Sequence, residues 1–220
     1  MHRSRHFLSE DDLAFIQETL AKTPADRDAL LELLIDPDEA DKLLDHPALF
    51  NACDRPRLTG NLSLRLFFYI RLRKVFSTLG VDDRDLADYV ACQLAEAAHR
   101  DRWLFPFSQT REPMLYAIEY FRDVETASGS QAFFLHASAG NHYLFMTGLF
   151  APFLEKRKAR RGAPGPAFYE SLGARSYAKA RDHRLAREYG MVELFDHLSS
   201  SFPHLRAALA TEANLWRKAS

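Results

Sequence analysis

The sequence predicts an all-α protein, a multi-helix bundle with a small N-terminal helical cap. Helix-start signals, in which a capping residue precedes acidic residues or proline, recur through the N-terminal part of the chain. Apolar residues recur at helical spacing through most of the remainder. There is no sequence repeat or low-complexity tract, and a single short segment has the alternation of a strand.

The cap is predicted as three short amphipathic helices within residues 1–55. Ser9 followed by Asp12 is a capping-box pattern and starts the first helix. Thr23 and Asp36 each precede a proline, which favours the first position of a helix. These two residues therefore start the second and third helices.

A turn-rich stretch over residues 47–61 separates the cap from the main helical bundle, predicted over residues 56–220. The next element, residues 62–80, begins with an alternation that suits a strand: Leu62, Leu64 and Leu66. Its length, its basic C-terminal part and its closing Gly80 favour a helix instead.

The rest of the bundle is predicted as helices over residues 82–98, 110–128, 166–180, 191–198 and 202–216. Pro166 starts the third of these at its first position. The helical period places one set of its residues on a common side: Tyr169, Leu172, Gly173, Ser176, Tyr177 and Ala180.

Residues 131–161 are the longest strongly apolar stretch, and we predict a buried central helix there because its apolar residues point nearly all round. Its apolar faces include Phe134, Ala137, Leu144, Phe145, Leu149 and Phe153. A membrane span is the alternative. Polar residues in the first half and an uninterrupted part shorter than the roughly 20 residues of a span argue against it.

Composition limits the function classes. The formal net charge is -1, so nucleic acid is not an expected partner of the surface as a whole. Cys53 and Cys92 are too few and too far apart for a disulfide framework or a zinc knuckle, which favours a reducing compartment. The N-terminus lacks the apolar core of a secretory signal, so we expect a cytoplasmic protein.

Glu96 and His99 are the sharpest candidates for metal ligands. A Glu and a His three apart project to one side of a helix, as ligands do in carboxylate-bridged di-iron bundles. Such a site needs a second pair, and the nearest match is Glu193 with His197. The alternative is a solvated polar pair at the end of an amphipathic helix.

His136 and His142 are candidates for binding a cofactor such as haem. Six residues apart, they lie about 120° from a shared face of a straight helix. Each could instead be a single axial ligand, or a core histidine that is hydrogen-bonded to a neighbour. The sequence does not identify a cofactor.

A basic run closes the central stretch and is a candidate anion-binding site: Lys156, Arg157, Lys158, Arg160 and Arg161. Basic residues at a helix C-terminus also complement the helix dipole, which is the alternative. Ser, His and Asp are all present, but the chain has no nucleophile-elbow, P-loop or dinucleotide fingerprint.

Residues 147–180 resemble a segment of uncharacterised bacterial helical proteins. The shared features are a Gly-Phe-Phe-Pro turn, a basic helix end and a following helix rich in tyrosine, and Ala151 interrupts the Phe-Pro junction here. The resemblance covers under a fifth of the chain. It implies a bacterial cytoplasmic helical protein and carries no activity.

These observations favour a non-enzymatic cytoplasmic protein that acts by protein–protein association, in its simplest form as a homo-oligomer. Catalytic signatures are absent from the sequence, whereas apolar stripes with basic rims are frequent. Two alternatives stay open. One is a haem-oxygenase-like or ferritin-like enzyme that uses the Glu and His residues above, and the other is a polyanion-binding protein that uses the basic helix end.

Overall fold

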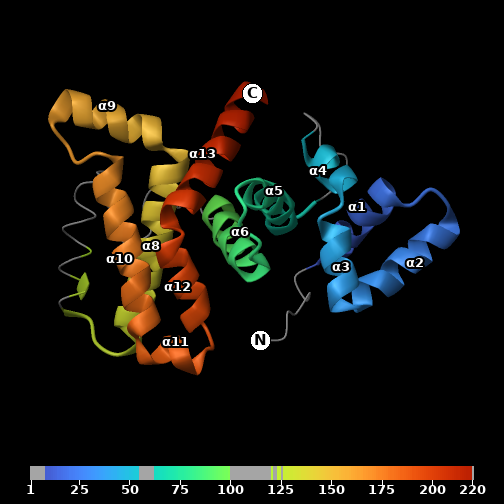
Figure 1. The fold of residues 1–220 in the computed structure, drawn as a ribbon, viewed down its shortest axis with the longest axis horizontal. Helices are drawn as coiled ribbons and strands as arrows, with labels where there is room; N and C mark the ends of the chain where they lie inside the picture. The colour runs from blue at the N-terminus through green and yellow to red at the C-terminus, as the bar shows by residue number, and fades with distance from the viewer. Residues whose placement is uncertain (1–7, 55–61, 100–119, 121–122, 125, 220) are drawn as a thin grey trace. The chain divides into compact units, whose positions relative to one another are not determined.

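The computed structural model describes residues 8–54, 62–99, 120, 123, 124 and 126–219, without the side chains of residues 99 and 215–219. These residues form twelve helices and no strand, which confirms the all-α prediction (Figure 1). The chain divides into two compact units, Met1–Ala95 and Glu96–Lys218. The predicted division into residues 1–55 and 56–220 stays a prediction. The boundary between the two compact units, at Ala95 and Glu96, falls inside a helix.

The first unit opens with the three predicted cap helices: α1 (Glu10–Leu20), α2 (Pro24–Ile35) and α3 (Pro37–Leu44). Each begins at the predicted capping residue, where a side-chain oxygen accepts hydrogen bonds from backbone N–H groups that have no partner inside the helix. The Ser9 and Thr23 caps are complete capping boxes. These starts depend only on residues within one helical turn, so the sequence identifies them directly.

The stretch predicted as turn-rich contains a fourth helix, α4 (Pro47–Cys53), which corrects the prediction for that part of residues 47–61. His46 Nδ1 accepts a hydrogen bond from the Ala48 N–H at 3.1 Å, and Pro47 takes the first helical position. The same start signal that was recognised earlier in the chain therefore operates here with a histidine as the cap.

Two longer helices complete this unit: α5 (Leu64–Thr78) and the N-terminal part of α6 (Arg84–His99). The helix interpretation of residues 62–80 is confirmed, and the strand alternative is wrong. Ser63 caps α5 by accepting a hydrogen bond from the Leu66 N–H. A bidentate ion pair between Arg65 and Asp88 ties α5 to α6, with an Nε–Oδ1 distance of 3.1 Å and an Nη2–Oδ2 distance of 2.8 Å.

The second unit contains the central stretch and the C-terminal helices: α8 (Ser130–Leu149), α9 (Ala151–Arg161), α10 (Pro166–Asp182), α11 (Arg184–Glu188), α12 (Val192–Ser200) and α13 (Phe202–Ala219). Helices α8, α10 and α12 run side by side (Figure 1). The side of α10 predicted to be apolar is the buried one, residue for residue. Most of the predicted helix over residues 110–128 lies outside the described residues.

The central stretch is two helices rather than one, because the chain leaves helical geometry at Phe150 and restarts with Pro152 in the first turn of α9. Residues 142–149 are all buried, as predicted. Phe134 and Phe153, predicted on apolar faces, are instead about half exposed. In the part of the chain that the structure describes, no helix is long and apolar enough to cross a membrane.

Two glycines allow α8 and α10 to approach closely. A Cβ added to Gly140 would lie 2.5 Å from Cδ1 of the buried Tyr177 ring, and one added to Gly173 would lie 3.0 Å from the Tyr143 Cβ. The Tyr177 hydroxyl donates a 2.7 Å hydrogen bond to Asn141 Oδ1, which holds the ring in place. Gly140 is therefore required by packing, although glycine weakens a helix interior.

We expect Gly140→Ala to destabilise the protein by about 1–2 kcal/mol. Overpacking costs about 1–3 kcal/mol, and the upper half of that range applies here because the buried Tyr177 ring is held by its hydrogen bond. The higher helix propensity of alanine returns about 1 kcal/mol. Urea unfolding followed by circular dichroism measures the change. Ser138→Ala on the same helix is the control, because it changes propensity without this clash, and equal or higher stability of Gly140→Ala would contradict the packing argument.

Candidate functional site

A buried polar cluster in the second unit contains the predicted His136. The Tyr120 hydroxyl lies 2.9 Å from His136 Nδ1 and 3.0 Å from Ser176 Oγ. The Ser176 hydroxyl also donates a 2.8 Å hydrogen bond to the Leu172 carbonyl. Because Ser176 uses its only hydroxyl proton in this bond, its oxygen accepts the hydrogen bond from the Tyr120 hydroxyl. The Tyr120 oxygen in turn accepts a hydrogen bond from a protonated Nδ1 of His136.

The cluster is only partly shielded from solvent, since Tyr120 is buried and His136 is half-buried. Burial raises the pKa of Tyr120, and burial together with the charges of Lys179 and His183 lowers the pKa of His136. Ser176 is only 1% exposed and its proton is held by a backbone carbonyl, so it cannot reach a substrate as a nucleophile. The arrangement is that of a hydrogen-bonded core network.

His142, the other predicted cofactor residue, is buried one and a half turns further along α8. Burial lowers its pKa to about 4, so the imidazole is neutral at pH 7. Its ring lies 5.3 Å from that of Tyr143 in an edge-to-face arrangement. His136 and His142 are not grouped with a third ligand, and haem or metal binding by either stays a prediction.

The predicted metal ligands occupy two helices. Glu96 and His99 lie at the end of α6, where Glu96 is exposed and the His99 side chain lies outside the described part. Glu193 and His197 are both exposed on α12. Among the described residues, no three His, Cys, Asp or Glu side chains are close enough to hold a metal ion. The di-iron hypothesis has no support from these positions and stays a prediction.

The predicted anion-binding run occupies α9. Lys156, Lys158, Arg160 and Arg161 are exposed, and the Arg157 guanidinium lies 5.8 Å from the centre of the Phe153 ring. Three of the basic residues occupy the last turn, where they complement the helix dipole before the left-handed Gly162 ends the helix. Nothing in the structure tests anion binding by these residues.

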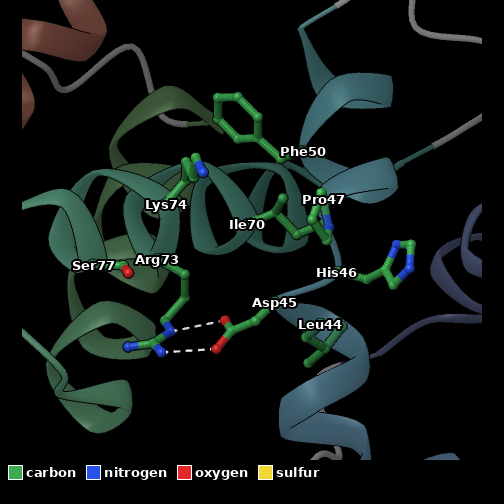
Figure 2. Close-up of a pocket in the computed structure, with 9 residues that line it drawn as sticks. All are labelled: Leu44, Asp45, His46, Pro47, Phe50, Ile70, Arg73, Lys74 and Ser77. Carbon is green, nitrogen blue, oxygen red and sulfur yellow. Dashed lines mark hydrogen bonds and ion pairs between the residues drawn. The ribbon is translucent and has the colours of Figure 1, made fainter.

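A pocket of about 110 Å³ lies in the first unit between the turn joining α3 to α4 and one face of α5 (Figure 2). Phe50 and Ile70 form its apolar walls, and Lys74 and Ser77 add an ammonium and a hydroxyl. Figure 2 shows the Arg73 guanidinium reaching across to the Asp45 carboxylate at the edge of this pocket.

Arg73 and Asp45 are the centre of an ion-pair network. Arg73 donates to both Asp45 oxygens at 3.0 and 2.9 Å and to Asp82 at 2.9 Å, and Arg84 donates to Asp45 at 2.6 Å. Burial alone would raise the pKa of Asp45, but the two arginines outweigh it and the pKa is lowered. The two arginines and the two aspartates neutralise one another. Their ion pairs connect the turn between α3 and α4 to α5 and to the start of α6.

Sequence reasoning missed this network, although a signal was present. Arg71 and Arg73 interrupt the apolar core of α5, and both guanidiniums are buried. A buried arginine needs a carboxylate partner, and the aspartates of the α3–α4 turn and of the segment before α6 supply it for Arg73. The identity of the partner could not be read from the sequence, because Arg73 and Asp45 are 28 residues apart.

The described surface also carries an apolar helix face without a cover, on α2. Leu30 is the only buried residue of this twelve-residue helix, although five of its last six residues are Leu or Ile. Ile35 is 82% exposed, Leu31 39% and Leu33 40%. Large exposed apolar side chains that share an element are typical of interaction surfaces.

Comparisons of the chain with protein family models, with curated proteins and with solved structures gave no match. The candidate sites therefore rest on the geometry above.

Proposed function

We propose that this protein acts by protein–protein association through α2, and that the partner is a second copy of the same chain. The observation that carries the proposal is the exposure of Leu31 and Ile35 on a helix that buries one residue. A helix of this length gains most of its stability from packing rather than from its own propensity. A cover over the exposed side of α2 would therefore stabilise both the helix and the complex.

The surface of α2 has the composition of a weak, specific interface. Asp28, Leu31, Glu32 and Ile35 follow at intervals of three, one and three residues, which places them on one side of the helix. They form a single exposed stripe, which we call the α2 stripe. Its apolar members supply the free energy of association, and its two carboxylates select the partner by charge.

We also place the protein in the cytoplasm. Cys53 is buried, Cys92 is half-buried, and neither forms a disulfide bond. Thiols persist in reducing compartments, whereas secreted proteins of this kind tend to pair them.

Sedimentation equilibrium between about 1 μM and 1 mM tests the proposal, because a weak interface of this kind has its dissociation constant in that range. We expect the average mass of the wild type to rise with concentration. Leu31→Lys is expected to raise the dissociation constant at least about tenfold by placing a charge in the apolar contact.

Leu33→Lys is the matched control. Leu33 is as exposed as Leu31 and lies on the same helix, but it projects about 160° away from Leu31. It should leave association unchanged. A wild type that remains monomeric throughout the concentration range, or equal effects of the two substitutions, would overturn the proposal.

A further inference from the structure

Acidic and basic residues are concentrated in two different regions of the chain, and this separation is the basis for choosing the partner surface of the α2 stripe. Residues 10–44, which hold α1 to α3, contain 11 acidic and 3 basic side chains, a formal charge of -8. Residues 151–188, which hold α9 to α11, contain 10 basic and 4 acidic side chains, a formal charge of +6. The near-zero net charge of the whole protein conceals these two opposed regions.

Helix α9 carries a stripe that matches the α2 stripe in spacing and opposes it in charge. Phe153, Lys156, Arg157 and Arg160 follow at the same intervals of three, one and three residues as Asp28, Leu31, Glu32 and Ile35. Phe153 is about half exposed, and Lys156 and Arg160 are exposed. We call these four residues the α9 stripe.

We propose that the α2 stripe of one chain docks on the α9 stripe of a second chain. This inference rests on the proposed function, since it names the partner surface of that same association. Leu31 and Ile35 would cover Phe153, while Asp28 and Glu32 would face Lys156 and Arg160.

Charge decides between this pairing and the contact of two like surfaces. Two α2 stripes would bring four carboxylates together, and two α9 stripes would bring six cations together, so like-charge repulsion opposes both. The α2–α9 pairing places opposite charges at each contact. Every chain carries both stripes, so each chain can offer its α2 stripe to one contact and its α9 stripe to another.

The Arg157 side chain adds to this pairing. Its guanidinium already lies 5.8 Å from the centre of the Phe153 ring, which orients the aromatic side chain at the surface. A preoriented aromatic group loses little conformational freedom on binding, so Phe153 suits the centre of such a contact.

A charge-swap experiment tests the pairing. Variant one carries Asp28→Lys and Glu32→Lys, and variant two carries Lys156→Glu and Arg160→Glu. In the measurement described above, each variant alone is expected to raise the dissociation constant at least about tenfold, because like charges would then meet. An equimolar mixture should restore association to within about threefold of the wild type, because each reversed stripe meets a complementary one.

Lys158→Glu is the control for Lys156→Glu alone, because it makes the same change in net charge on α9 but projects about 160° away from Lys156, off the stripe. It should leave the dissociation constant close to that of the wild type. Circular dichroism of every variant confirms folding, since all substituted residues are exposed.

The outcomes separate the two proposals. A wild type that associates and is weakened by Leu31→Lys, but is indifferent to variant two, retains the proposed function and overturns the α2–α9 pairing. A mixture of the two variants that stays monomeric overturns the pairing as well. A wild type that never associates overturns both.

Discussion

Asp45→Ala is expected to lower the free energy of unfolding by about 3 kcal/mol, the lower end of the cost of breaking a buried ion pair. The Arg73 side chain is 5% exposed, so it depends on carboxylates that reach it from the surface. Asp45→Ala removes two hydrogen bonds of Arg73 and also the 2.6 Å hydrogen bond that Arg84 donates to Asp45. Asp82 remains and limits the loss.

Asp82→Ala is the matched control for this prediction. Asp82 contacts the same guanidinium at 2.9 Å but is 85% exposed, compared with 31% for Asp45. A solvated carboxylate contributes little to an ion pair, so we expect a loss below about 1 kcal/mol. Urea unfolding measures both changes, and equal losses would contradict a network centred on Asp45.

A double-mutant cycle of Arg73→Met with Asp45→Ala isolates the interaction between these two residues. Once the buried guanidinium is replaced by an apolar side chain, Asp45→Ala is expected to cost about 1 kcal/mol, because the carboxylate then serves Arg84 alone. If Asp45→Ala costs as much stability in the Arg73→Met background as in the wild type, the contribution of Asp45 does not come from its pairing with Arg73.

Lowering the pH from 7 to 5 is expected to cost about 2 kcal/mol of stability through His142 alone. Burial lowers its pKa from 6.5 to about 4 in the folded protein. Above pH 6.5 the ring is neutral in both states and contributes no pH dependence. Between pH 6.5 and 4 the unfolded chain binds the proton more readily, so the stability falls, and below about pH 4 the loss levels off.

The comparison of wild type with His142→Gln measures this contribution. The variant is expected to be less stable at pH 7, since its core is altered, but it should lose about 2 kcal/mol less than the wild type on going to pH 5. His136, whose pKa is also lowered, contributes equally to both proteins and cancels. Parallel pH profiles for the two proteins would contradict a buried neutral His142.

The parts of the fold that the sequence predicted correctly are those that depend on neighbouring residues. Ser9, Thr23 and Asp36 act within one turn, and the buried side of α10 follows from helical period alone. Helix α4 was missed because histidine is an unusual cap, although Pro47 carried the usual signal.

The sites were less predictable because they depend on contacts between distant parts of the chain. Nothing near Arg73 in the sequence marks Asp45 as its partner, and nothing near His136 marks the Tyr120 hydroxyl. Hydrophobic pattern likewise could not tell that Phe153 and Ile35 face solvent, because exposure is decided by whether another element covers them. The metal and haem predictions concern residues that the described structure does not gather into one site.

The local helix caps of α1, α2 and α3 have a kinetic consequence. Each of these helices begins with hydrogen bonds between residues two to four positions apart, so the entropy lost in closing those loops is small. Helices of this kind form within about a microsecond, well before distant segments meet. These three helices can therefore start from contacts within a single turn, before distant residues such as Arg73 and Asp45 meet.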